Sequence, residues 1–227
     1  MSDAPTSFSL LVQLNALSGG LFLLTAFGLM AMRQVLASLN LFVFQSVLLA
    51  ASALLLGYQY ASAHLFTVGA ITLGVKSVLI PRILRRTVSK EVYARREISQ
   101  VFNIPSSLVI AVALVLVAYF ATSPLLSSGA QSFVQINLPI GTAGLLLGAY
   151  AIVVRREALP QVIGILSMEN GALFAGVSIA PDLPIIAELA TAFDVLVIAL
   201  VMGLLTRRIH ERLGTTAVGK MAALREE

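Results

Sequence analysis

The chain has 227 residues, of which 58% are hydrophobic and 11% charged, and its mean hydropathy is +0.94. Soluble domains carry roughly 25% charged residues, so the composition indicates one polytopic membrane domain and excludes an ordinary soluble enzyme. The net charge of +4 does not indicate nucleic-acid binding, because the basic residues stand beside apolar segments, as topology determinants do. The absence of cysteine excludes disulfides, thiol catalysis and cysteine-ligated iron–sulfur clusters in this chain.

Seven apolar segments each approach the ~20 residues that cross a bilayer core of ~30 Å. They predict an all-α membrane protein with spans at Ser9–Met32, Leu36–Gly57, Ala63–Leu84, Ile104–Phe120, Ile136–Val154, Ala158–Ala180 and Pro184–Thr206. The longest charged segment, residues 85–100, joins the third span to the fourth, and a charge-free linker, residues 121–135, leads to the fifth. A polar tail, residues 207–227, follows the last span.

The basic residues predict the orientation. If the spans alternate, one side of the membrane receives Arg33, the bases between residues 82 and 96, Arg155 with Arg156, and the bases of the tail. Lys76 is the one basic residue deep inside a predicted span, because Arg82 lies two residues from the end of its span. We expect the protein in a bacterial plasma (inner) membrane. The positive-inside rule then places the tail on the cytoplasmic side of this membrane and the N-terminus on the outer side.

An internal repeat links the two halves of the chain. Residues 20–34 resemble residues 144–158, and Gln45-Ser46 in the following span then corresponds to Glu169-Asn170. We therefore predict two parallel three-helix units, residues 1–86 and 131–206, joined by a cytoplasmic loop and a linking helix (87–130) and followed by a cytoplasmic tail (207–227). Membrane transport proteins are often built from such repeats.

Three carboxylates lie in the last two predicted spans: Glu169 and Asp194 near the midplane, and Glu188 nearer the outer surface. Lys76 lies about two thirds of the way through the third span. A charge at the bilayer centre costs about 2.5–3.5 kcal/mol, and a buried carboxyl can exchange a proton near neutral pH. These four residues predict a proton relay in which Lys76 tunes the carboxyls. The alternative is a structural ion pair, for instance Lys76 with Asp194, that fixes helix packing.

Gln45 and Asn170 are neutral amides within apolar spans, and they either extend this polar path or bond neighbouring helices. The sequence has no metal-ligand spacing, no phosphate-binding loop and no nucleophile with a nearby base. We therefore predict that the chain holds no metal or cofactor and is not catalytic alone.

The last three predicted spans resemble the small K-type membrane subunit of respiratory complex I and the C subunit of multisubunit sodium/proton antiporters. The shared residues are Arg155-Arg156, Ile163-Gly164, Met168, Asn170, Asp194 thirteen positions before the arginine pair at Arg207, and the tail sequence TTAVGKM. Over its whole length the chain is similar to component E of hydrogenase-4 and formate-hydrogenlyase-type complexes.

This resemblance implies a subunit of a complex that couples electron transfer to proton or sodium translocation. It also implies a nickel–iron centre and iron–sulfur clusters in partner subunits, and antiporter-like subunits beside it in the membrane. Of the two K-type glutamates, the second falls on Asp194. Leu166 occupies the position of the first, and Glu169 follows three residues later, about 4.5 Å along the helix. Glu188 and Lys76 have no K-type counterpart. A C-type subunit of a stand-alone cation/proton antiporter and a non-conducting structural subunit remain as alternatives.

Overall fold

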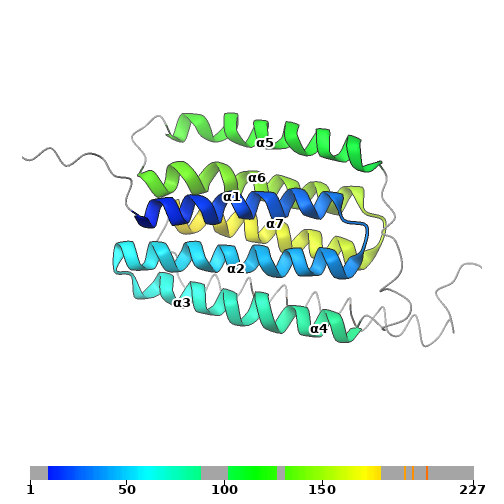
Figure 1. The fold of residues 1–227 in the computed structure, drawn as a ribbon, viewed down its shortest axis with the longest axis horizontal. Helices are drawn as coiled ribbons and strands as arrows, with labels where there is room; N and C mark the ends of the chain where they lie inside the picture. Colours follow the sequence, from blue (N-terminus) through cyan, green and yellow to red (C-terminus); the bar gives the residue numbers. More distant parts are fainter. Residues whose placement is uncertain are drawn as a thin grey trace, which may run out of the picture.

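The computed structural model describes residues 10–87, 102–126 and 131–179, together with the single residues Ala192, Leu196 and Gly203. Its elements are all helices: α1 (Leu10–Ala31), α2 (Val35–Tyr60), α3 (Ala63–Ile71), η1 (Thr72–Leu79), α4 (Ile80–Thr87), α5 (Ile104–Leu126), α6 (Ser132–Val154) and α7 (Ala158–Ile179). They lie side by side along one axis (Figure 1). The predicted all-α fold is confirmed.

Six helices in the described part of the chain are long and apolar enough to cross a membrane. One of them is continuous over Ala63–Arg85 and contains α3, η1 and most of α4. The protein is therefore an all-α integral membrane protein, and six of the seven predicted spans have a counterpart. The seventh, residues 184–206, lies outside the described residues except for three single positions.

The predicted end of the fourth span was wrong. It was expected at Phe120, but α5 continues to Leu126, and α6 likewise begins at Ser132, within the predicted linker. Pro124 provides no N–H for the Phe120 carbonyl four residues earlier. Ser123 Oγ donates a hydrogen bond to that carbonyl instead, at 2.9 Å. The serine therefore satisfies the group that the proline leaves open, and the helix continues through both residues.

Four helices form a bundle at the centre of the protein. Within it α1 contacts α2 and α6, and α7 contacts the same two helices. On one side α5 packs against α6 and α1, and on the other the α3–η1–α4 span packs against α2 (Figure 1).

The chain reverses direction at each connection, so the C-terminal ends of α1, α4 and α6 lie at the same end as the N-terminal ends of α2, α5 and α7 (Figure 1). We call this the basic end, because it carries Arg33, Arg82, Arg85, Arg155 and Arg156. In the described ranges, every charged residue other than Lys76 and Glu169 belongs to this end. The distribution follows the pattern of basic residues predicted from the sequence.

Glycines bring α6 and α7 into close contact. A Cβ added to Gly148 would lie 2.3 Å from the backbone nitrogen of Met168, and one on Gly171 would lie 2.1 Å from the backbone nitrogen of Leu145. Small residues at a helix interface let backbones approach closely, which matters in a membrane because packing drives helix association there. The contact also fixes the level of Glu169, two residues from Gly171, relative to the rest of the bundle.

Candidate functional site

A buried ion pair joins the third span to α7. Lys76 Nζ donates a hydrogen bond to Glu169 Oε1 at 3.0 Å, and the two side chains are 1% and 9% exposed. Two of the four residues predicted for the relay therefore meet. Glu188 and Asp194 lie outside the described residues. The partner of Lys76 within the described ranges is Glu169, whereas the sequence had suggested Asp194 as an example.

Lys76 lies in η1, a π-helical segment within the continuous third span. There the N–H of Ile80 bonds to the carbonyl of Val75, five residues earlier. Pro81 follows directly, and a proline ring clashes with the carbonyl four residues before it. The wider π turn relieves that clash, and π segments inside α-helices occur frequently at functional sites. The span was predicted from the sequence, and Pro81 was the available signal for the π-helical segment, which was not predicted.

Asn170, the neighbour of Glu169, reaches across to α2. Its Nδ2 donates a hydrogen bond to Ser46 Oγ at 2.9 Å, and Ser46 Oγ donates to the carbonyl of Phe42 at 3.0 Å. Gln45, which precedes Ser46, is fully buried, and neither of its side-chain polar atoms has a hydrogen-bond partner within the described ranges. Both amides predicted for the polar path are therefore in the interior, and Asn170 bonds neighbouring helices.

The ion pair and these amides occupy one level of the bundle. A Cβ added to Gly69 of the third span would touch Leu54 of α2. Because the two helices run antiparallel, Lys76, seven positions after Gly69, comes opposite residues 46 and 47, which precede Leu54 by eight and seven positions. The Asn170–Ser46 hydrogen bond places α7 at the same level. We call Gln45, Ser46, Lys76, Glu169 and Asn170 the central polar layer.

A second buried polar group joins α1, α2 and α6 farther from the basic end. Asn15 Nδ2 donates to Asn137 Oδ1 at 2.7 Å, Ser52 Oγ donates to Asn15 Oδ1 at 2.6 Å, and Asn137 Nδ2 donates to Ser52 Oγ at 3.0 Å. All three side chains are fully buried. We call them the amide cluster. The sequence prediction missed it, although an asparagine within an apolar span was the available signal.

Two phenylalanines pack between these polar groups. The ring centroids of Phe22 and Phe174 lie 4.5 Å apart, and both side chains are 0% exposed. They form one hydrophobic cluster with Leu48 and Leu49. A Cβ on Gly144 would lie 2.7 Å from the Phe22 ring, so the glycine leaves the space that this ring fills. We call these two phenylalanines and two leucines the aromatic layer.

A buried arginine links three helices at the basic end. Arg155 is 1% exposed, its Nη2 donates a hydrogen bond to the carbonyl of Leu29, and its Nη1 donates to the carbonyl of Pro160 at 3.5 Å. Leu29 lies in the last turn of α1, where carbonyls have no partner within the helix. Burial lowers the pKa of Arg155 to about 10, so the side chain is a cation at pH 7. Arg155 thus caps α1 in addition to marking topology.

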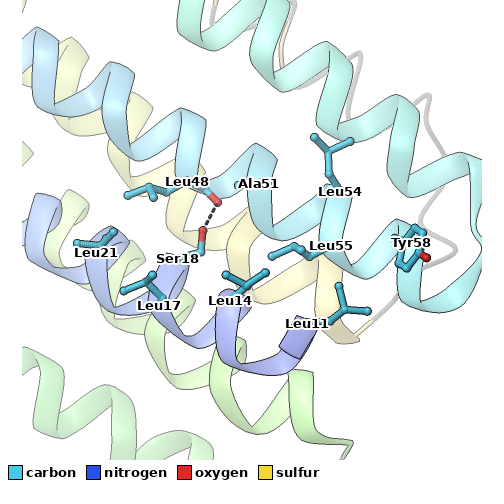
Figure 2. Close-up of a pocket in the computed structure, with 10 residues that line it drawn as sticks. All are labelled: Leu11, Leu14, Leu17, Ser18, Leu21, Leu48, Ala51, Leu54, Leu55 and Tyr58. Atoms are coloured by element: carbon cyan, nitrogen blue, oxygen red, sulfur yellow. Dashed lines mark hydrogen bonds between the residues drawn. The ribbon is translucent and has the colours of Figure 1, made fainter. Parts of the chain in front are cut away.

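An open apolar groove runs between α1 and α2 (Figure 2). Leucines from both helices line it, Tyr58 lies at one end, and Ser18 Oγ turns away to donate a hydrogen bond to the Leu48 carbonyl at 3.2 Å. Leu17 and Tyr58 are largely exposed. The groove therefore belongs to the apolar outer surface and is separate from the buried polar groups.

Comparisons with known proteins show similarity over the full chain. The chain is 32% identical over 227 residues to the uncharacterised protein Rv0085 of Mycobacterium tuberculosis, covering 100% of both chains. It is 28% identical over 214 residues to hydrogenase-4 component E of Escherichia coli K12, covering 91% of this chain and 94% of that protein. The protein of the same name from Shigella flexneri matches with the same identity and coverage. No protein-family model matches the chain, and no solved structure matches it.

Proposed function

We propose that this chain, a homologue of hydrogenase-4 component E, is a membrane subunit of a hydrogenase-type complex that provides part of a proton relay. The similarity covers nearly the whole of both chains, and the six apolar helices suit a subunit embedded in the membrane arm. In such a complex the nickel–iron centre and the iron–sulfur clusters belong to partner subunits. The positive-inside rule supports an orientation with the basic end in the cytoplasm.

The Lys76–Glu169 ion pair is the observation that carries the relay. Both charged groups are withdrawn from water near the middle of apolar spans. Burying an ion pair usually costs more than the attraction returns, and apolar replacements of similar size are often as stable. Helix packing alone is therefore a poor explanation for the pair, whereas intramembrane ionisable residues typically belong to ion pathways.

The pair can pass a proton and return to its ion-paired state. A proton that reaches the Glu169 carboxylate neutralises it and leaves the Lys76 ammonium without its counter-ion. Loss of a proton from Lys76 then produces a neutral pair, and return of the carboxyl proton to the amine restores the ion pair. Asn170 and Ser46 extend the polar surroundings toward α2. We propose Glu188 and Asp194 as the further carboxyls of the relay.

Replacing Glu169 with Gln tests this function in the assembled complex in membrane vesicles. We expect electron transfer to continue while proton translocation is lost, because the amide cannot carry the proton. Glu157→Gln is the matched control, since Glu157 lies at the basic end outside the spans, and it should translocate normally. Full translocation by assembled Glu169→Gln complex would reject the relay and leave a structural subunit. Asp194→Asn tests the last acid in the same assay.

We also propose that the two three-helix units are structural repeats, related to each other by a two-fold axis that runs through the bundle. Asn15 bonds to Asn137 across 122 residues, and Ser46 bonds to Asn170 across 124. Equivalent residues of two units touch each other only where a two-fold axis passes between them. The 124-residue spacing of Ser46 and Asn170 equals the offset between residues 20–34 and 144–158 and supports a duplication in which Gln45 is the counterpart of Glu169, whereas Asn15 and Asn137 lie two residues off that offset.

A further inference from the structure

The interior of the four-helix bundle is layered along its axis. On α2, Ser46 belongs to the central polar layer and Ser52 to the amide cluster, while Leu48 and Leu49 lie between them. The six-residue separation of the two serines corresponds to about 9 Å. On α7, Phe174 lies four residues beyond Asn170, about 6 Å farther from the basic end. The aromatic layer thus separates two buried polar groups within one bundle.

The two polar groups differ in how their hydrogen bonds are arranged. The amide cluster closes on itself, because each of its three members donates to another. The central polar layer contains an ion pair and the fully buried Gln45. Between them the Phe22 and Phe174 rings are both 0% exposed and lie 4.5 Å apart, and the polar contact at this level is the hydrogen bond from Ser18 Oγ to the Leu48 carbonyl. A proton moving from one group to the other must therefore pass the aromatic layer, which lies within the ~9 Å between Ser46 and Ser52.

We propose that the Phe22–Phe174 contact is the closed gate of the proton path and that the amide cluster is the polar station on its far side. This inference rests on the proposed function, since it names the route by which protons leave or reach the Lys76–Glu169 pair. Hydrophobic constrictions in membrane proteins close by excluding water. Separation of the rings would admit water between Asn170 and the amide cluster, and ring closure would again isolate the pair.

Phe174→Ala in the assembled complex tests the gate. The substitution opens a cavity bounded at both ends by polar groups, and cavities with polar partners hold water whereas apolar cavities stay dry. We expect a loss of coupling: electron transfer continues, but fewer protons are translocated per electron pair. Phe174→Leu, which keeps an apolar side chain in the gap, should retain coupling. Phe22→Ala removes the opposite ring and should reproduce the loss of coupling if Phe174→Ala fails to assemble.

Phe42→Ala is the matched control. Phe42 is also 0% exposed, but it belongs to a different hydrophobic cluster, on the basic side of Ser46. Its removal leaves the aromatic layer intact and opens space on the basic side of Ser46, outside the stretch between the central polar layer and the amide cluster, so coupling should persist.

The gate is rejected if both Phe→Ala variants of the aromatic layer couple as fully as Phe42→Ala. That result differs from failure of the relay itself, which is read from Glu169→Gln. The double variant Phe174→Ala/Asn137→Leu tests whether one route runs through both layers. If its loss of coupling equals the loss in Asn137→Leu alone, the result supports a single route. Additive losses from these two substitutions would reject the amide cluster as a station on that route.

Discussion

Lys76 and Glu169 meet 3.0 Å apart in the interior of the helices, although 93 residues separate them in the chain. They are buried counter-ions, so changing either one removes the opposite charge that the other contacts at 3.0 Å. Breaking a buried pair by removing one member typically costs about 3–5 kcal/mol. The pair is therefore testable through stability as well as through transport.

We predict that Lys76→Met and Glu169→Leu each destabilise the protein, and that the double variant is more stable than either single one. The double variant replaces two charges with apolar side chains of similar size, which is often neutral or stabilising. Thermal unfolding of the detergent-solubilised complex would measure the difference. Additive destabilisation in the double variant would show that the two side chains do not depend on each other.

The α6–α7 contact provides a prediction about packing. Gly148→Ala should destabilise the protein, because the new Cβ would lie 2.3 Å from backbone atoms of α7 that cannot move independently. Gly20→Ala is the matched control: no atom lies within 4 Å of a Cβ there, and alanine favours a helix by up to about 1 kcal/mol over glycine. The comparison requires only the unfolding temperatures of the two variants. Equal temperatures would contradict the close approach of α6 and α7.

The sequence predicted the helices better than it predicted their contacts. Span length follows from bilayer thickness, so apolar runs were sufficient to place six helices. Glu169 and Lys76 were both identified because charge in an apolar span is costly. Their pairing depends on how α7 and the third span pack around α2, and no local pattern contains that information.

Other features were missed because their signals are weak. The amide cluster consists of neutral side chains that barely reduce the hydropathy of a span, and only the tertiary structure shows that Asn15 and Asn137 meet. The fourth span was expected to end at Phe120, and Pro124, which normally stops a helix, gives no signal that α5 continues to Leu126. The compensating hydrogen bond from Ser123 to the Phe120 carbonyl became evident only from the geometry.

The amide cluster should show strong coupling between its members. Asn137→Leu leaves the Asn15 side chain and Ser52 without one of their partners, at about 1–3 kcal/mol for a buried polar group left unsatisfied. Once Asn137 is Leu, Asn15→Leu should add little or even restore stability, because fewer polar atoms remain unpaired. A double-mutant cycle by thermal unfolding measures this coupling. Independent losses would indicate that the three side chains do not act as one group.

The orientation can be tested by thiol labelling, because the chain has no natural cysteine. We predict that Arg156→Cys, at the exposed basic end, reacts with a membrane-impermeant reagent added to the cytoplasmic side. Tyr58→Cys, near the other end of α2 and 70% exposed, should react only from the outside. Inside-out and right-side-out vesicles separate the two cases. The reverse pattern would overturn the proposed orientation.

Arg155 and Arg156 are adjacent arginines with different environments, which makes them a matched pair for the last prediction. Arg155 is buried and bonds to the Leu29 and Pro160 carbonyls, whereas Arg156 is exposed. Arg155→Met should cost about 1.5–3 kcal/mol, the range for hydrogen bonds to a charged group, because the end of α1 loses its cap. Arg155→Lys should recover only part of this loss, since a single ammonium lacks the forked geometry that reaches two carbonyls. Arg156→Met should change stability by less than about 0.5 kcal/mol, as exposed substitutions usually do. Unfolding temperatures of the three variants rank these effects, and equal values for the two methionine variants would refute the capping role of Arg155.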